Sequence, residues 1–229
     1  MNHKLYIHIG MAKTGTSTIQ KYFYLNMDLL KSLGVYYPSP LVSPLIKDWH
    51  VGHCSMGESG SLIRYDATPW HYYRDRYFEM LKSAQCKTNI LSAEVLFYDS
   101  PKNLAVFKDN FDTKIICFFR NVFDFLKSAV QQTIKEGLRQ DLFTFSSHRN
   151  HHVLGWIEDY ILFFGKENCI FLNFDKLRRQ HSMLDVFLKT IGDDIDFKHT
   201  DIQNDNITPS DALTMFMYQL SFFPFAYSE

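Results

Sequence analysis

The chain has 229 residues and a net charge of −1 at neutral pH, and 46% of its residues are hydrophobic. This composition supports a folded core and excludes disordered and collagen-like chains, while the near-zero charge argues against a protein that coats nucleic acid. The charge is unevenly distributed, because the first 27 residues carry three lysines and no acidic side chain. The amino-terminal segment is therefore suited to receive a small anion.

The order of predicted elements begins with a buried strand at residues 4–9, a turn, and a helix over 16–33 that Gly34 ends as a C-cap. Residues 35–69 contain four prolines and predict a long irregular excursion. Further strands are predicted at residues 89–93, 113–119 and 169–174, and further helices at about 70–86, 122–138, 151–164, 182–191 and 209–221.

Strands that alternate with helices in this way predict an α/β fold with a central parallel sheet flanked by helices. We expect residues 1–229 to form a single domain, with an aromatic helix and tail at about 209–229. Ligands of such sheets bind beyond the carboxyl ends of the strands. Three segments are therefore of interest, at residues 10–18, 92–98 and 119–128.

The first of these segments resembles a phosphate-binding loop, Gly10-Met-Ala-Lys13-Thr14-Gly15-Thr16-Ser17-Thr18. Small residues let backbone N–H groups approach an anion, the following helix adds the positive end of its dipole, and Lys13 adds a full charge. The hydroxyl groups of Thr14, Thr16, Ser17 and Thr18 add donors. The loop differs from a Walker A motif, in which the lysine follows the second glycine. The alternative is an ordinary helix capped by threonine or serine.

His8-Ile-Gly-Met-Ala-Lys-Thr-Gly-Thr-Ser-Thr resembles the 5′-phosphosulfate loop of sulfotransferases that use 3′-phosphoadenosine-5′-phosphosulfate (PAPS). It is most similar to bacterial, carbohydrate-type members. These enzymes hold the 3′-phosphate with an arginine at a strand end and a serine eight residues later, and Arg120 and Ser128 match that spacing. The usual proline of this second motif is Val122 here. For Arg120, the alternative is a surface ion pair with Asp124.

The resemblance implies a P-loop-NTPase-like three-layer fold and sulfuryl transfer from PAPS to a hydroxyl acceptor, with a carbohydrate or glycan as the expected class. Lys13 would stabilise the leaving phosphate, and the residues from Lys13 to Thr18 would bind the phosphosulfate. The resemblance implies no metal requirement. The acceptor hydroxyl needs a general base, for which the candidates are His50, His53 and Glu94. A solvated loop histidine and a glutamate that orients other side chains are the respective alternatives.

Two other functions remain open on the sequence: a P-loop kinase for small molecules, and a catalytically inactive nucleotide-binding module. Four scattered cysteines without a CxxC pair, no signal sequence and no long apolar run indicate a soluble, cytoplasmic protein. Six aromatic rings in residues 216–227 suggest core packing, a homodimer contact or a peripheral membrane contact. Other rings flank the excursion and form a candidate acceptor wall, namely Trp49, Tyr65, Trp70, Tyr72 and Tyr73.

Overall fold

The computed structural model describes residues 3–41, 52–58, 68–121 and 153–192, together with residues 123–125, 127–128 and 131. Two compact units are distinguished, one comprising Met1–Arg120 and Leu154–Ile202, the other Asn121–Val153 and Gln203–Glu229. The single domain expected from the sequence stays a prediction. The described strands all belong to the first unit.

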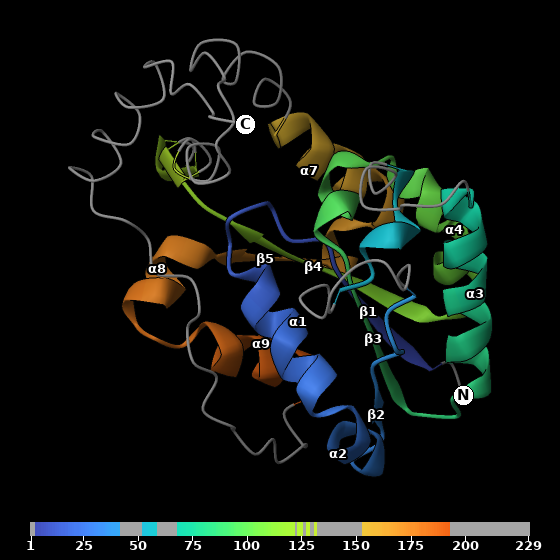
Figure 1. Cartoon of the computed structure of the whole chain (residues 1–229). Helices are drawn as coiled ribbons and strands as arrows, with labels where there is room; N and C mark the ends of the chain where they lie inside the picture. Colours follow the sequence, from blue (N-terminus) through green and yellow to red (C-terminus); the bar gives the residue numbers. More distant parts are fainter. Residues whose placement is uncertain are drawn as a thin grey trace, which may run out of the picture. The chain divides into compact units, whose positions relative to one another are not determined.

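Five parallel strands form one sheet in the order β2-β3-β1-β4-β5 (Figure 1). Their bounds are β1 (Lys4–His8), β2 (Val35–Tyr36), β3 (Thr88–Ser92), β4 (Asp112–Phe119) and β5 (Cys169–Asn173). In this register His8 lies opposite Ser92 on β3 and opposite Ile116 on β4. The predicted parallel sheet is thus confirmed, and the carboxyl ends of β1, β3 and β4 meet at one edge.

The helices are α1 (Thr16–Leu25), α2 (Met27–Ser32), α3 (Trp70–Ser83), α4 (Ala105–Asn110), α7 (Val153–Phe164), α8 (Phe174–Arg179) and α9 (Met183–Ile191). Short 3-10 helices are η1 (Cys54–Met56), η3 (Glu94–Tyr98), η4 (Pro101–Leu104) and η5 (Lys166–Asn168).

Two predicted elements differ from the structure, and two short helices were not predicted. The helix expected over 16–33 is interrupted at Asn26, whose side-chain amide donates to the Tyr22 carbonyl (2.7 Å) and competes with the helical pattern. The excursion at 35–69 is less irregular than expected, since it begins with β2 and contains η1. Helices α4 and α8 were not predicted, because each spans only six residues. The helix expected at 209–221 lies outside the described residues.

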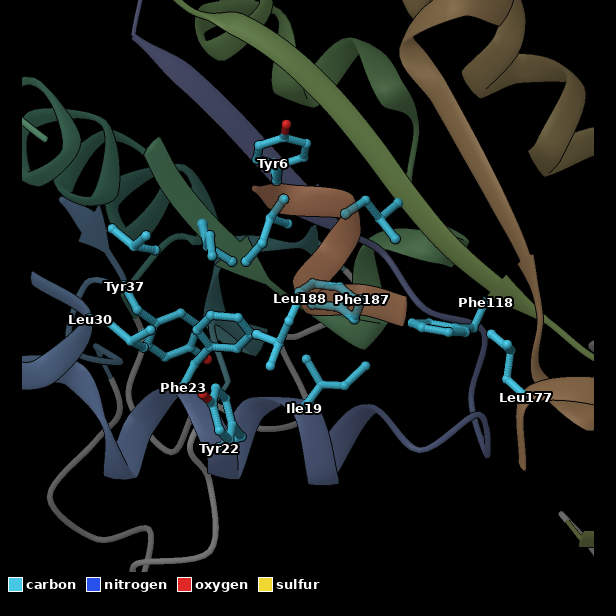
Figure 2. Close-up of a cluster of buried hydrophobic side chains, with 14 of the residues drawn as sticks. Tyr6, Ile19, Tyr22, Phe23, Leu30, Tyr37, Phe118, Leu177, Phe187 and Leu188 are labelled. Carbon is cyan, nitrogen blue, oxygen red and sulfur yellow. The ribbon is translucent and has the colours of Figure 1, made fainter. Parts of the chain in front are cut away.

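A cluster of buried apolar side chains fixes α1 on the sheet (Figure 2). Phe23 of α1 stacks on Tyr37 with ring centroids 5.4 Å apart and meets Phe187 of α9 edge-on at 5.6 Å. From β4, Ile116 and Phe118 join the same cluster, since alternate residues of a strand share a face. Burying each of these large side chains contributes about 1.5–3 kcal/mol. The amino end of α1 is therefore held rigidly at the carboxyl edge of the sheet.

The opposite face of the sheet is also covered. Residues Leu5, Ile7 and Ile115, which alternate with the members of the first cluster, are fully buried. Figure 1 shows α1, α8 and α9 on one side of the sheet and α3 and α4 on the other. This arrangement confirms the three-layer fold with helices on both faces of a parallel sheet.

Candidate functional site: an anion-binding loop at the carboxyl edge of the sheet

The loop after β1 follows the neighbouring strand β4 before it turns into α1. The backbone N–H of Ile9 donates to the Ile116 carbonyl (3.0 Å), and that of Met11 donates to the Phe118 carbonyl (3.4 Å). The backbone of Lys13 then adopts a left-handed conformation with a φ of 64°, which costs a residue with a side chain about 1–2 kcal/mol. A lysine in this conformation indicates that neighbouring contacts determine the shape of the loop.

Helix α1 begins at Thr16, and its N-cap is Gly15 with a φ of 75°. A Cβ atom at Gly15 would lie 2.6 Å from the Met183 sulfur, so a side chain there would displace the end of Met183 and would also be strained by the positive φ. Within the described residues no side chain caps this helix, which argues against the threonine- or serine-capped helix considered from the sequence. The amino end of α1 thus combines backbone N–H donors, the positive end of the helix dipole and the adjacent, half-buried Lys13.

The four hydroxyl groups of this segment do not have equal roles. Thr14 is fully buried and its hydroxyl donates to the Met11 carbonyl (2.5 Å), so it stabilises the loop from inside. Thr16 is also buried, whereas Ser17 is exposed and Thr18 is partly exposed. The expectation that all four hydroxyls face a ligand is therefore too broad for Thr14, whose backbone N–H remains as its possible contribution.

Glu94 follows β3 at the start of η3 and lies near the loop. Partial burial raises the pKa of its carboxyl group, while the Thr16 hydroxyl and the positive charge of Lys13 act in the opposite direction. The Thr16 hydroxyl is beside this carboxyl group, although the two do not meet with good hydrogen-bond geometry. Glu94 retains partial solvent exposure. The structure thus brings together a lysine, a threonine and a carboxyl group from two different strand ends.

His53 occupies a different environment from Glu94. It is fully buried, and its Nδ1 accepts a hydrogen bond from the Ser92 N–H (2.9 Å) while its Nε2 donates to the Pro38 carbonyl (2.9 Å). These partners assign the neutral tautomer that is protonated at Nε2. Burial lowers the pKa of His53 to about 4. Since both ring nitrogens have backbone partners, the geometry favours Glu94 over His53 as a proton acceptor; His50 lies outside the described residues.

Ser92 is the centre of this buried polar group, and sequence reasoning did not single it out. Its hydroxyl lies 2.8 Å from His8 Nδ1 and accepts from Gln20 Nε2 (3.2 Å). Its carbonyl accepts from the backbone N–H of His53 (2.8 Å). His8 is fully buried, and this burial lowers its pKa to about 3. The only sequence signal for Ser92 was a polar residue at the end of a buried strand.

Arg120 directly follows β4, and its side chain is only 7% exposed. Its Nη1 donates to the Lys13 carbonyl (3.1 Å), and its Nη2 lies 3.4 Å from a carboxylate oxygen of Asp175. The guanidinium group also stacks over the Phe174 ring, 5.2 Å from the ring centroid. The sequence did not predict the contacts of Asp175 and Phe174 with Arg120, because these residues approach Arg120 only after the sheet is assembled.

The second unit contains the other residues that the sequence associated with Arg120. Its described residues agree with the predicted helix at 122–138, because the helical ones are 123–125, 127–128 and 131. Ser128 is partly exposed within this segment. Asp124 and Ser128 belong to a unit separate from Arg120, so a phosphate clamp of Arg120 and Ser128 stays a prediction.

The aromatic residues at the start of α3 divide into core and surface. Tyr73 is buried, Tyr72 is 51% exposed, and the Trp70 ring lies 5.2 Å from the Arg74 guanidinium. Tyr73 therefore belongs to the core. Trp49 and Tyr65 lie outside the described residues, as do residues 193–229 with the carboxyl-terminal aromatic cluster. The acceptor wall stays a prediction.

The part of the chain that the structure describes contains neither a cluster of metal ligands nor a membrane-spanning helix. No three histidine, cysteine, aspartate or glutamate side chains in it are grouped as a metal site would require. No helix in these residues has the length and apolar character needed to cross a membrane.

The fold has solved counterparts. A sulfotransferase from Alicyclobacillus acidocaldarius superposes with a TM-score of 0.53 at 14% sequence identity, over 94% of this chain and 91% of that one. The sulfotransferase domain from the curacin biosynthetic pathway superposes with a TM-score of 0.50 at 10% identity, over 86% of this chain and 76% of that domain. No protein-family model matches the sequence, and no curated protein matches it. The chain therefore shares its fold with known sulfotransferases.

Proposed function

We propose that this protein is a sulfotransferase that moves a sulfuryl group from PAPS to a hydroxyl acceptor, with a carbohydrate or glycan as the acceptor class. The observation that carries the proposal is the loop between β1 and α1. It places Lys13 at the uncapped amino end of a helix, and Arg120 lies against it. The shared fold with two solved sulfotransferases supports this assignment.

The donor would bind with its phosphosulfate at the amino end of α1. Backbone N–H groups of residues 14–17 and the hydroxyls of Thr16, Ser17 and Thr18 are the proposed donors to its oxygens. Lys13 supplies the positive charge next to the bridging oxygen. Arg120 and Ser128 are the proposed ligands of the 3′-phosphate, which would exchange some of the present partners of Arg120 for phosphate oxygens.

In the reaction, the acceptor hydroxyl oxygen attacks the sulfur atom in line with the bridging oxygen. A sulfur–oxygen bond forms to the acceptor, the bond from sulfur to the bridging oxygen breaks, and its electron pair stays on the leaving phosphate. Glu94 takes the acceptor proton, because its raised pKa makes it a stronger base than an ordinary glutamate. Lys13 stabilises the negative charge that develops on the leaving group. Catalysis then depends mainly on positioning and electrostatic stabilisation.

The proposal is tested with PAPS that carries radioactive sulfur in its sulfuryl group, incubated with the purified protein and a panel of carbohydrates and phenols. We expect transfer of the label to at least one carbohydrate. Transfer only to a phenol would contradict the acceptor class while supporting the reaction type. Magnesium-dependent transfer of the γ-phosphate of ATP would favour the kinase. Binding of the spent donor, adenosine 3′,5′-bisphosphate, without transfer to any acceptor would favour the inactive module.

A further inference from the structure

Arg120 contacts the anion-binding loop itself, which is a different role from holding a 3′-phosphate. The loop is already tied to β4 by the bond from the Met11 N–H to the Phe118 carbonyl (3.4 Å). Arg120 lies two residues beyond Phe118, and its Nη1 reaches the Lys13 carbonyl at 3.1 Å. Lys13, which has a left-handed backbone conformation although it is not a glycine, is therefore also the residue whose carbonyl this guanidinium contacts.

The guanidinium group is in turn held by the start of α8. Its Nη2 pairs with Asp175 at 3.4 Å, and its Cζ lies over the Phe174 ring, 5.2 Å from the ring centroid. Phe174 belongs to the buried core, and its ring also borders Gly15, since a Cβ atom at that glycine would lie 3.2 Å from it. One aromatic side chain thus packs against both Arg120 and the loop that Arg120 contacts.

We propose that Arg120, held in place by Asp175 and Phe174, is a positioning residue that keeps Lys13 in its left-handed conformation, so that the loop is shaped before the nucleotide binds. A planar guanidinium has several donors in fixed directions, which allows one group to bind a carboxylate and a carbonyl at the same time. Preorganising a loop in this way increases affinity by reducing the entropy lost on binding. The ligand-binding part of this inference rests on the proposed function.

The first test compares two ligands that differ in the 3′-phosphate. Adenosine 5′-phosphosulfate has none, so an arginine that serves only the 3′-phosphate does not affect its binding. We expect Arg120→Ala to weaken this ligand about tenfold in calorimetric titrations, a change typical of losing a charge-assisted hydrogen bond. Asp175→Asn should weaken adenosine 5′-phosphosulfate and adenosine 3′,5′-bisphosphate by a similar factor of about three. An effect of Arg120→Ala on the bisphosphate alone would overturn the inference.

The second test needs no nucleotide. Hydrogen–deuterium exchange of a peptide covering residues 9–19 should be faster in Arg120→Ala than in the unmodified protein. If Arg120→Ala folds poorly, Arg120→Lys replaces it in this test. Lysine retains the charge but lacks the planar donor group that contacts both the Lys13 carbonyl and Asp175, so this peptide should also exchange faster in Arg120→Lys. Arg179→Ala is the matched control, because Arg179 donates to the Asp175 backbone carbonyl (3.1 Å) from the exposed side of α8. Arg179→Ala should leave the exchange rate of this peptide and the affinities for both nucleotides unchanged.

Unchanged exchange of this peptide in both Arg120 variants would overturn the inference. If the unmodified protein binds neither nucleotide, the proposed function fails, while the exchange measurement still decides whether Arg120 shapes the loop.

Discussion

The loop after β1 and the end of β3 lie at the same edge of the sheet but use their polar groups in opposite ways. After β1, the amino end of α1 has no side-chain cap within the described residues, and Lys13 beside it is half-buried. At the end of β3, Ser92 exchanges hydrogen bonds with His53, which lies just before η1, and both residues are buried. Residue type alone does not reveal this difference, since histidine and serine are common catalytic residues. The burial and hydrogen-bond partners of the second segment show that it stabilises the fold, and those of the first are consistent with the ligand-binding role proposed for it.

Glu94 lies where these two segments meet, and its replacement should have the largest effect. If Glu94 accepts the acceptor proton, Glu94→Gln should lower kcat about 10²–10⁴-fold, the usual contribution of a general base. Affinity for adenosine 3′,5′-bisphosphate should be little changed. The pH profile provides a second readout: because the pKa of Glu94 is raised, the rate should increase with pH through a value above that of an ordinary glutamate. A variant with full activity would remove Glu94 from the mechanism.

Lys13→Ala tests whether the loop after β1 binds the donor. Loss of a positive donor from the leaving group should cost about 2.7–4 kcal/mol of transition-state stabilisation, or about 10²–10³ in kcat. The thermal midpoint should hardly move, since the Lys13 side chain is only half-buried. A variant that loses stability but keeps its activity would show that Lys13 stabilises the fold and does not take part in the reaction.

Replacing His53 tests whether the buried group of Ser92 and His53 stabilises the fold. His53→Ala should reduce the free energy of unfolding by about 3 kcal/mol, because it removes a buried ring and leaves the Ser92 N–H and the Pro38 carbonyl without their partner. Urea denaturation measures this change. After correction for the folded fraction, the rate of sulfuryl transfer should fall far less than in Glu94→Gln. A fall of 10²-fold or more in a fully folded variant would restore His53 as a candidate base.

A smaller effect is expected from pH. Since burial lowers the pKa of His53 to about 4 and of His8 to about 3, both are neutral when folded but become protonated in the unfolded chain below pH ~6.5. Unfolding therefore takes up protons in this range, and stability falls as the pH falls. Each histidine contributes about 1.4 kcal/mol per pH unit between pH ~6.5 and its lowered pKa. The stability of His53→Gln should depend less steeply on pH by this amount; an equal slope would contradict the buried, neutral assignment.

Much of the fold could be predicted because its strongest signals are local. The apolar runs that became β1 and β4, and the small residues between β1 and α1, are contiguous in the sequence. The interruption at Asn26 was missed because an asparagine side chain competes with the helix without breaking the apolar period.

The site was only partly predictable for the same reason. Lys13 was predicted from the adjacent loop residues and Arg120 from its resemblance to a family motif, whereas Asp175 reaches Arg120 through the pairing of β4 with β5. The partners of His53 likewise come from β3 and from Pro38, so its burial is a property of the assembled sheet. Contacts of this kind depend on tertiary packing, which local patterns do not encode.

The central claim is that the loop from Gly10 to Thr18 binds the phosphates of a PAPS-type nucleotide, and calorimetric titration with adenosine 3′,5′-bisphosphate tests it most directly. We expect binding at micromolar concentrations without added metal, lost in Lys13→Ala and strongly weakened in Arg120→Ala, while Arg179→Ala binds normally. No heat of binding with the intact, folded protein would contradict the account, as would an affinity that Lys13→Ala leaves unchanged.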